Sequence, residues 1–398
     1  MAELLIISSL MMLLALVLYL CIGWPILSTL ELPSIAANLH NLHDHLAGVL
    51  AASGHTVMAR GTAATSSIRF FITCDPENVR HIFTSNHGNY PKGHEFAEIF
   101  DIMAGVSFTL DGEPYLRLRA KMLSILGDPR LVASMAASCL DKVRDGVLPF
   151  LARVATAGAP FDMQDLTGRL MFDVTSMAVF GVHPGYLSPG PDMPPAHAAA
   201  AMDTVMEVGL IRHAVPASWW KSMRRLNIGP ERRLAAAHRV LHGFVGRAVR
   251  DPEAVPAGAY GAEDGGRRRR DAERPRGARR RRGDAVLISL YSMGRMESLW
   301  GKDCREYRPE RWLTGGDGGG SGGAQLRHVP SHKFLAFNSG ARMCPGKSIA
   351  VMLMKTIAAA VVWNFDVEMV EGQAVEPKMS CLFQMKNGLM LKVKKRQI

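Results

Sequence analysis

One cysteine lies in a setting that could do chemistry. The stretch FNSGARMCPG, residues 337–346, places Cys344 directly before Pro345 and an apolar run that predicts a helix. Proline suits the first turn of a helix, where its missing N–H has no cost. The free N–H groups and the positive dipole end of a helix start lower the pKa of a nearby thiol. The sequence therefore predicts a thiolate at Cys344.

The neighbours of Cys344 narrow what a thiolate there would bind. Gly340 allows a tight bend before the sulfur, and Gly346 leaves room for a flat group close to the helix. Arg342 is a fixed cation suited to a carboxylate, and Phe337 provides an apolar wall. A sulfur ligand, a flat neighbour and a carboxylate partner together describe haem, iron protoporphyrin IX, with its propionates.

Three other interpretations of this cysteine stay open on residue chemistry alone. A lone cysteine is often a small buried hydrophobe. A nucleophilic cysteine would need a positioned histidine base. A zinc site could use His328, His332 and Cys344, but the chain has no second cysteine pair and the spacing matches no closed tetrahedral site.

The whole chain has the composition of a globular protein. Its 398 residues are 48% hydrophobic and can form one large core or two domains. Its six cysteines are scattered, and none form a CxxC pair. This spacing indicates reduced thiols in a domain that faces the cytosol rather than a disulfide framework.

The N-terminus predicts a membrane anchor within residues 1–23. Residues 4–23 carry no charge, and twenty residues in a helix span about 30 Å, the thickness of the hydrocarbon core. A cleaved signal peptide is the alternative, but the run is long and no Lys or Arg precedes it. Because the first cationic side chain is Arg60, the positive-inside rule does not set the orientation.

The positive charge is concentrated in one segment. Of the formal net charge of +11, residues 265–283 contribute +8, from ten Arg against Asp271 and Glu273. Residues 251–283 are rich in Pro, Gly, Ala and Arg, which predicts a low-complexity linker between 24–250 and 284–398. An Arg-rich arm that binds nucleic acid is the rival interpretation, but the anchor argues against it, so no nucleic-acid partner is expected.

The remaining sequence predicts a mainly α chain with small β-sheets. Helical spacing of apolar residues predicts helices over 34–54, 75–85, 111–126, 160–181, 195–213, 230–250 and from Gly346 onward. Short strands are predicted over 55–61, 67–75 and 285–294. The dipeptide Asn387-Gly388 predicts a hairpin turn near the C-terminus.

The opening stretch resembles a known family signature. The pattern F-x-x-G-x-R-x-C-x-G over 337–346 resembles the haem-binding loop of the cytochrome P450 family, and YRPERW (307–312) resembles its meander. NYPKG (89–93), IRHAVPASWWK (211–221) and residues 285–312 resemble the plant clan that hydroxylates fatty acids and alkanes. The resemblance implies the cytochrome P450 fold over 24–250 and 284–398.

The resemblance also implies roles for individual residues. Cys344 would be the axial ligand of the haem iron, and Arg342 would pair with a propionate. The family's W-x-x-x-R pattern is filled here by Tyr115 and Arg119, after an unusual Pro114. Arg119 would reach a propionate, and Tyr115 would keep a hydrogen-bond donor of different reach.

Two further family elements have no counterpart in their expected place. One is the central helix with [AG]-G-x-[DE]-T, whose acid and threonine supply protons for oxygen activation. The other is the E-x-x-R helix that partners Arg311 of the meander. The nearest strings, AAMDT (200–204), ENVR (77–80) and ERPR (273–276), lie elsewhere, so the sequence identifies no catalytic residues. Both elements would fall between residues 250 and 284, which is too short for several helices.

The resemblance implies a haem-dependent monooxygenase on the endoplasmic reticulum membrane, single-pass, with its catalytic domain in the cytosol. NADPH–cytochrome P450 reductase would supply electrons from NADPH, and the substrate would be a long-chain acyl or alkyl compound. The first alternative is a truncated, non-catalytic relative, and the second is a binding protein that uses the Arg-rich segment.

Overall fold

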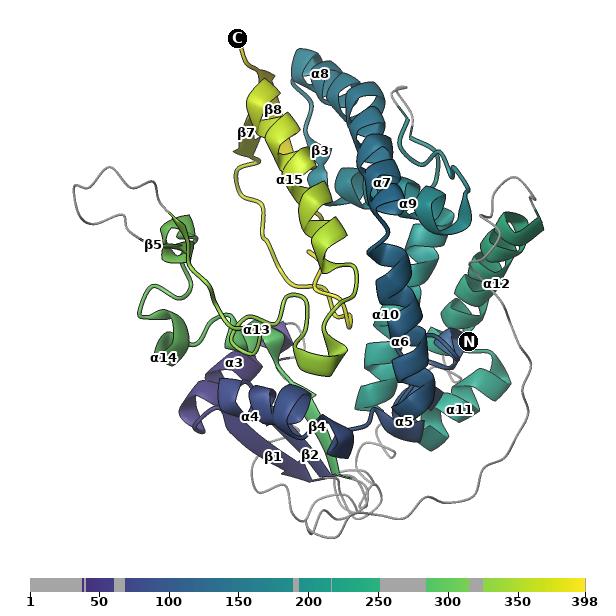
Figure 1. Cartoon of the computed structure of the whole chain (residues 1–398), viewed down its shortest axis with the longest axis vertical. Coiled ribbons are helices and arrows are strands. Elements are labelled where there is room, and N and C mark those ends of the chain that lie inside the picture. Colours follow the sequence, from purple (N-terminus) through teal and green to yellow (C-terminus); the bar gives the residue numbers. More distant parts are fainter. Residues whose placement is uncertain are drawn as a thin grey trace, which may run out of the picture. The chain divides into compact units, whose positions relative to one another are not determined.

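A computed structural model describes Asn38 and residues 41–60, 69–188, 193–215, 217–250, 284–314 and 325–397 (Figure 1). They form two compact units, each treated by itself. The first contains the described residues up to Tyr90 and those from 284 to Cys344, and the second contains those from Pro91 to 250 and from Pro345 onward. The predicted anchor and the Arg-rich linker lie outside the described residues.

The first unit is built on a three-stranded sheet. Its order is β1 (Thr56–Arg60), β2 (Arg69–Thr73), β4 (Asp284–Ile288), with β1 antiparallel and β4 parallel to β2. The three predicted strands are confirmed. The third ends earlier than predicted, because the Ser289 hydroxyl accepts the Ser292 N–H at 3.3 Å and begins the short helix α13 (Leu290–Met293).

Short helices and turns complete this unit. Asp75, the first residue of the helix predicted over 75–85, caps α4 (Pro76–Arg80) by accepting the Glu77 N–H at 2.9 Å. The core cluster of this unit includes the buried side chains of Leu50, Val79 and Leu335. The remaining elements are α3 (Leu42–Ala52), α4 (Pro76–Arg80), η2 (His81–Ser85), η3 (His87–Asn89), α14 (Glu297–Trp300), η6 (Pro309–Trp312), β5 (Leu313–Thr314), β6 (Gln325–Leu326) and η7 (Gly340–Arg342).

The second unit is mostly helical. Its main core cluster packs α7, α8, α9 and α15 together. The helices are α5 (Gly93–Ile99), α6 (Gly112–Leu126), α7 (Pro129–Lys142), α8 (Leu148–Ala157), α9 (Met163–Phe180), α10 (His197–Ala214), α11 (Ala217–Leu226), α12 (Gly229–Arg250) and α15 (Lys347–Asn364), with turns η4 (Asp101–Met103) and η5 (Val143–Val147).

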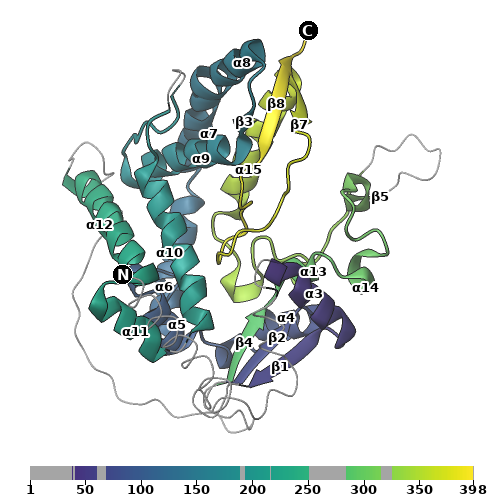
Figure 2. The same ribbon diagram turned by 180° about the vertical axis from the view of Figure 1, so that it is seen from behind.

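A second three-stranded sheet flanks α15 in this unit (Figure 2). Its order is β3 (Phe161–Asp162), β8 (Met390–Lys395), β7 (Phe365–Met369), with antiparallel pairing throughout. The predicted C-terminal hairpin is wrong in its pairing, because β8 pairs with β7 and β3 and the chain only turns at Asn387-Gly388. The helix predicted from 160 begins later, since Phe161 and Asp162 form β3.

Helix α15 is the central apolar element of the second unit. Ile349, Leu353, Ile357 and Val361 repeat at helical spacing and are buried in the main core cluster. Among the described residues, α15 is the one helix whose length and composition would let it cross a membrane. Its buried stripe and its contacts with α7 and β7 are those of a core helix in a globular unit.

Candidate functional site

The ten-residue loop around Cys344 is closed by its own backbone. The Cys344 N–H donates to the Phe337 carbonyl at 2.8 Å, so the first and eighth residues of the stretch are joined. Inside this closure, the Arg342 N–H donates to the Ser339 carbonyl at 3.2 Å, and the Met343 N–H to the Gly340 carbonyl at 3.1 Å. The predicted tight bend before the sulfur is therefore confirmed as the 3₁₀ turn η7.

Two residues of the loop have left-handed backbone conformations. Asn338 has φ +61°, which asparagine tolerates, and its side-chain oxygen accepts the Ser339 N–H at 2.9 Å. Gly340 has φ +53°. A Cβ at Gly340 would also overlap the carbonyl oxygen of Phe83 and come within 3.0 Å of Thr84 Oγ1. Glycine is therefore needed at this position for its conformation and for the space it leaves.

The thiol of Cys344 is exposed at the end of this loop. The helix that follows begins at Lys347 with Gly346 as its N-cap, so Pro345 precedes the cap rather than occupying the predicted first turn. Cys344 therefore precedes the N-cap of α15 by two residues. Arg342 lies half-buried in η7.

The remaining predicted site residues lie on one helix of the second unit. Tyr115 and Arg119 are one turn apart on α6, and Arg119 Nη1 donates to the Tyr115 hydroxyl at 3.3 Å. Tyr115 is buried and Arg119 is partly buried. The Asp111 carboxylate at the start of α6 accepts the N–H groups of Lys92 and Gly93, at 3.0 and 2.8 Å.

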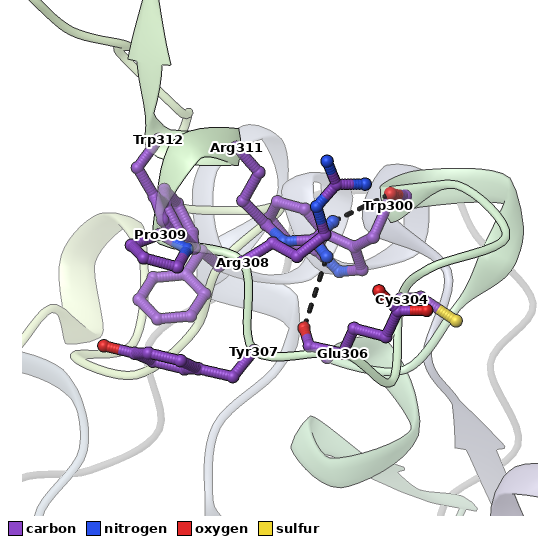
Figure 3. Close-up of a pocket in the computed structure, with 10 residues that line it drawn as sticks. Trp300, Cys304, Glu306, Tyr307, Arg308, Pro309, Arg311 and Trp312 are labelled. Atoms are coloured by element: carbon purple, nitrogen blue, oxygen red, sulfur yellow. Dashed lines mark hydrogen bonds between the residues drawn. The ribbon is translucent and has the colours of Figure 1, made fainter.

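The meander surrounds Arg311 with acceptors. Its guanidinium donates to the carbonyls of Trp300, Asp303 and Glu306 at 3.0, 2.9 and 3.3 Å, two of which are drawn in Figure 3. It also lies 3.4 Å from the Asp303 carboxylate. The hydrogen bond from Arg308 lowers the pKa of that carboxyl, and the charge of Arg311 lowers it further. Arg311 therefore has an acidic neighbour within the meander itself, which the sequence did not predict.

A cavity of about 270 Å³ borders Arg311 within the first unit (Figure 3). Its aromatic wall includes Trp300, Trp312 and Phe334, whose ring centroids lie 5.0 to 6.4 Å apart. Tyr307 lies on its rim and is 94% exposed.

The strings that mimic missing family elements have ordinary roles. Asp203 on α10 accepts a hydrogen bond from Gln384 at 2.9 Å, and the Thr204 hydroxyl donates to the Ala200 carbonyl of its own helix. Glu77 and Arg80 form an exposed ion pair on α4 at 2.8 Å. Neither string is the proton-delivery helix or the partner of the meander arginine.

The donor set at the loop fits a haem iron. A thiolate-ligated haem needs one protein sulfur, and Cys344 presents an exposed sulfur after a closed loop with Arg342 two residues away. In the part of the chain that the structure describes, no three His, Cys, Asp or Glu side chains gather as a metal cluster. The five cysteines in that part are all free thiols.

Comparison with known proteins supports the same family. A family model described as Cytochrome P450 matches residues 277–398. Cytochrome P450 86B1 of Arabidopsis thaliana is 28% identical to this chain, and the alignment covers 94% of this chain and 86% of that protein. The resemblance of this chain to the cytochrome P450 family is therefore confirmed. The alkane hydroxylase MAH1 of Arabidopsis thaliana and noroxomaritidine synthase 2 of Narcissus pseudonarcissus are each 27% identical, with coverage of 94% of this chain and of 93% and 91% of those proteins.

These alignments are longer than the chain. The alignment with noroxomaritidine synthase 2 runs over 482 positions, whereas 94% of 398 residues is about 374. About 108 aligned positions of that relative therefore have no counterpart in this chain.

Some residues of the loop environment were not found by sequence reasoning. The contact of Phe83 with Gly340 uses a backbone carbonyl, which leaves no mark on residue type. The hydrogen bond at 2.8 Å between the hydroxyls of Ser331 and Ser339 joins residues whose side chains gave no motif. Asp303 gave no signal in the sequence, because the family resemblance places the acidic partner of Arg311 on a different helix.

Proposed function

We propose that Cys344 is the axial thiolate ligand of haem in this P450. The observation that carries the proposal is the closed loop, which ends in an exposed sulfur two residues before the N-cap of α15. Arg342, and Arg119 from α6, would pair with the propionates, and Tyr115 would hold Arg119 through their hydrogen bond. Phe337 and Gly346 would line the haem beside the sulfur. When bound, thiolate-ligated haem supplies the activation of dioxygen with electrons from NADPH.

The proposal is tested by haem reconstitution of two variants. Cys344→Ala should lose the carbon-monoxide difference band of reduced, thiolate-ligated haem, because no sulfur remains in the loop. Cys304→Ala is the matched control, since Cys304 lies in the same unit but outside the loop. An unchanged band in Cys344→Ala, or an equal loss in both variants, would contradict the assignment.

We propose a long-chain acyl or alkyl compound as the substrate class. The support is the resemblance of residues 89–93 and 211–221 to the plant clan that hydroxylates such chains, together with the alkane hydroxylase among the relatives. Noroxomaritidine synthase 2 has the same identity, so the sequence segments carry this choice. Binding spectra with a long-chain fatty acid, an alkane and a compact aromatic compound test it. A response to the aromatic compound alone would contradict it.

We propose that the protein is held on the endoplasmic reticulum by residues 1–23, with the following domain in the cytosol beside NADPH–cytochrome P450 reductase. The uncharged twenty-residue run supports this placement. Protease added to intact microsomes should digest the chain beyond the anchor. Protection of the chain beyond residue 40 would reverse the topology.

We propose that the chain as given is a weak monooxygenase or a non-catalytic relative. About 108 positions of a related P450 have no counterpart, and the chain has no [AG]-G-x-[DE]-T pattern. A cavity lies beside Arg311, the residue that the E-x-x-R helix is expected to contact. Positioned acid groups typically contribute 10²–10⁴ in rate, so the loss of the acid and threonine has a large effect. Sequencing the transcript across codons 250–285 tests whether the helices are encoded.

A further inference from the structure

The turn that follows α4 is wider than an α-helical turn. In η2, the Asn86 N–H donates to the His81 carbonyl at 2.8 Å, which is a bond between residues five apart. Single π turns of this kind are rare overall, but those that occur often lie at functional sites. Buried side chains hold the turn against the core of its unit. Ile82 within the turn is 9% exposed, and Val79 in the preceding helix α4 is fully buried.

The loop of Cys344 meets this turn at Gly340. A Cβ on Gly340 would overlap the Phe83 carbonyl oxygen, and it would lie 2.7 Å from the Phe83 carbonyl carbon and 3.0 Å from Thr84 Oγ1. The nearest atoms belong to the backbone, which cannot rotate aside as a side chain can. The two segments therefore meet at a contact that one added methyl group would disrupt.

Both sides of the contact are anchored in the same core. Phe83 packs against the cluster that contains Leu335, and Leu335 is 5% exposed. Ser339, directly before Gly340, is 1% exposed, and its hydroxyl is hydrogen-bonded to Ser331 at 2.8 Å. A shift at Gly340 has little room to relax on either side, so it would pass along the loop toward Cys344.

We propose that η2 is a platform that positions the sulfur of Cys344. Phe83 and Thr84 are positioning residues, and they act through their contact with Gly340. This inference rests on the proposed function of Cys344 as the haem ligand. It adds that the direction of the sulfur is set by a turn more than 250 residues earlier in the chain.

Gly340→Ala tests the platform against a closely matched control. Gly54 lies in the same unit with φ +71°, and a Cβ there would have nothing within 4 Å. Gly54→Ala therefore carries the conformational cost of a left-handed alanine without a steric overlap. We expect Gly340→Ala to lose the carbon-monoxide band of thiolate-ligated haem while part of the total haem absorbance remains, and Gly54→Ala to retain the band.

A second substitution separates the steric overlap from backbone strain. Asparagine tolerates the left-handed conformation better than alanine, but it carries the same Cβ. Gly340→Asn should therefore be as defective as Gly340→Ala. Recovery of the band in Gly340→Asn would assign the defect to strain alone and would overturn the platform.

Two readouts do not need haem. In the apo chain, Gly340→Ala should change the alkylation rate of Cys344 and raise amide hydrogen exchange over residues 337–346, relative to Gly54→Ala. If the natural chain gives no thiolate band, the proposed function fails, and these two measurements still decide whether η2 positions the loop. Equal rates in both variants would overturn the inference.

A variant without added bulk covers the case in which Gly340→Ala does not fold. Thr84→Gly loosens η2, and Glu77→Gly introduces the same residue on α4, away from Gly340. Thr84→Gly should raise hydrogen exchange over residues 339–344, and Glu77→Gly should leave those amides unchanged. Similar exchange in both variants would contradict the role of the turn.

Discussion

Glu231→Ala should strongly destabilise the second unit. Glu231 lies on α12 and receives two hydrogen bonds of 2.7 Å from Arg212 of α10. Their side chains are only 2% and 1% exposed. The Arg212 guanidinium also lies 4.5 Å from the centre of the Trp220 ring and 2.9 Å from Asp101. Removal of Glu231 would leave a buried cation with one partly exposed acidic partner.

The expected size follows from this burial. Breaking a buried ion pair typically costs about 3–5 kcal/mol of unfolding free energy. Because Asp101 still pairs with Arg212, the expected loss is at the lower end, about 3 kcal/mol. For a unit of this size, 1 kcal/mol lowers the melting temperature by about 2–4 °C, so the expected decrease is about 6–12 °C. The assay is thermal unfolding followed by circular dichroism.

Glu77→Ala is the control for this prediction. It removes an ion pair whose side chains are 65% and 54% exposed, and such pairs contribute about 0–1 kcal/mol. The double variant Arg212→Met/Glu231→Leu should recover much of the loss, because apolar residues of similar volume often replace a buried pair without cost. A melting temperature of Glu231→Ala equal to that of Glu77→Ala would refute the reasoning.

Three further results are expected. Asp303→Ala should lower stability in urea unfolding much less than Arg311→Ala does, because Arg311 keeps three carbonyl acceptors and the lost carboxylate is partly exposed; equal losses in the two variants would contradict this. Burial lowers the pKa of His213 below its ordinary 6.5, so the unfolded chain gains a proton that the folded chain does not; stability should fall as the pH drops below about 6.5, and an equally steep loss in His213→Gln would count against this cause. Supplied with a plant reductase, NADPH and long-chain fatty acids or alkanes, the chain should give no hydroxylated product above background, and turnover like that of a full-length relative would show that the missing positions are tolerated.

The sequence predicted the elements that depend on local patterns. The predicted helix boundaries at 75 and 181 coincide with Asp75, the N-cap of α4, and Gly181, the C-cap of α9, because caps act within a few residues. The ten-residue loop was identified because its signature is contiguous. The pairing of β8 with β7 and β3 was missed, since strand partners are chosen by long-range packing that a turn signal does not encode.

The environment of the site was less predictable than the site itself. Gly340 was recognised as a bend, but its contact with Phe83 joins two segments far apart in the chain through backbone atoms. The buried pair of Arg212 and Glu231 was not predicted, because its 19-residue separation spans two helices and fits no helical repeat. Burial and partners of a charged side chain are tertiary properties.

The most direct test of the central claim is X-ray absorption at the iron edge of the haem-loaded chain. We expect one sulfur neighbour at the iron in the natural chain and in Cys304→Ala, and none in Cys344→Ala, because Cys344 carries the exposed sulfur of the loop. Iron with only nitrogen and oxygen neighbours in the natural chain, or sulfur that persists in Cys344→Ala, would contradict the assignment of Cys344 as the haem ligand.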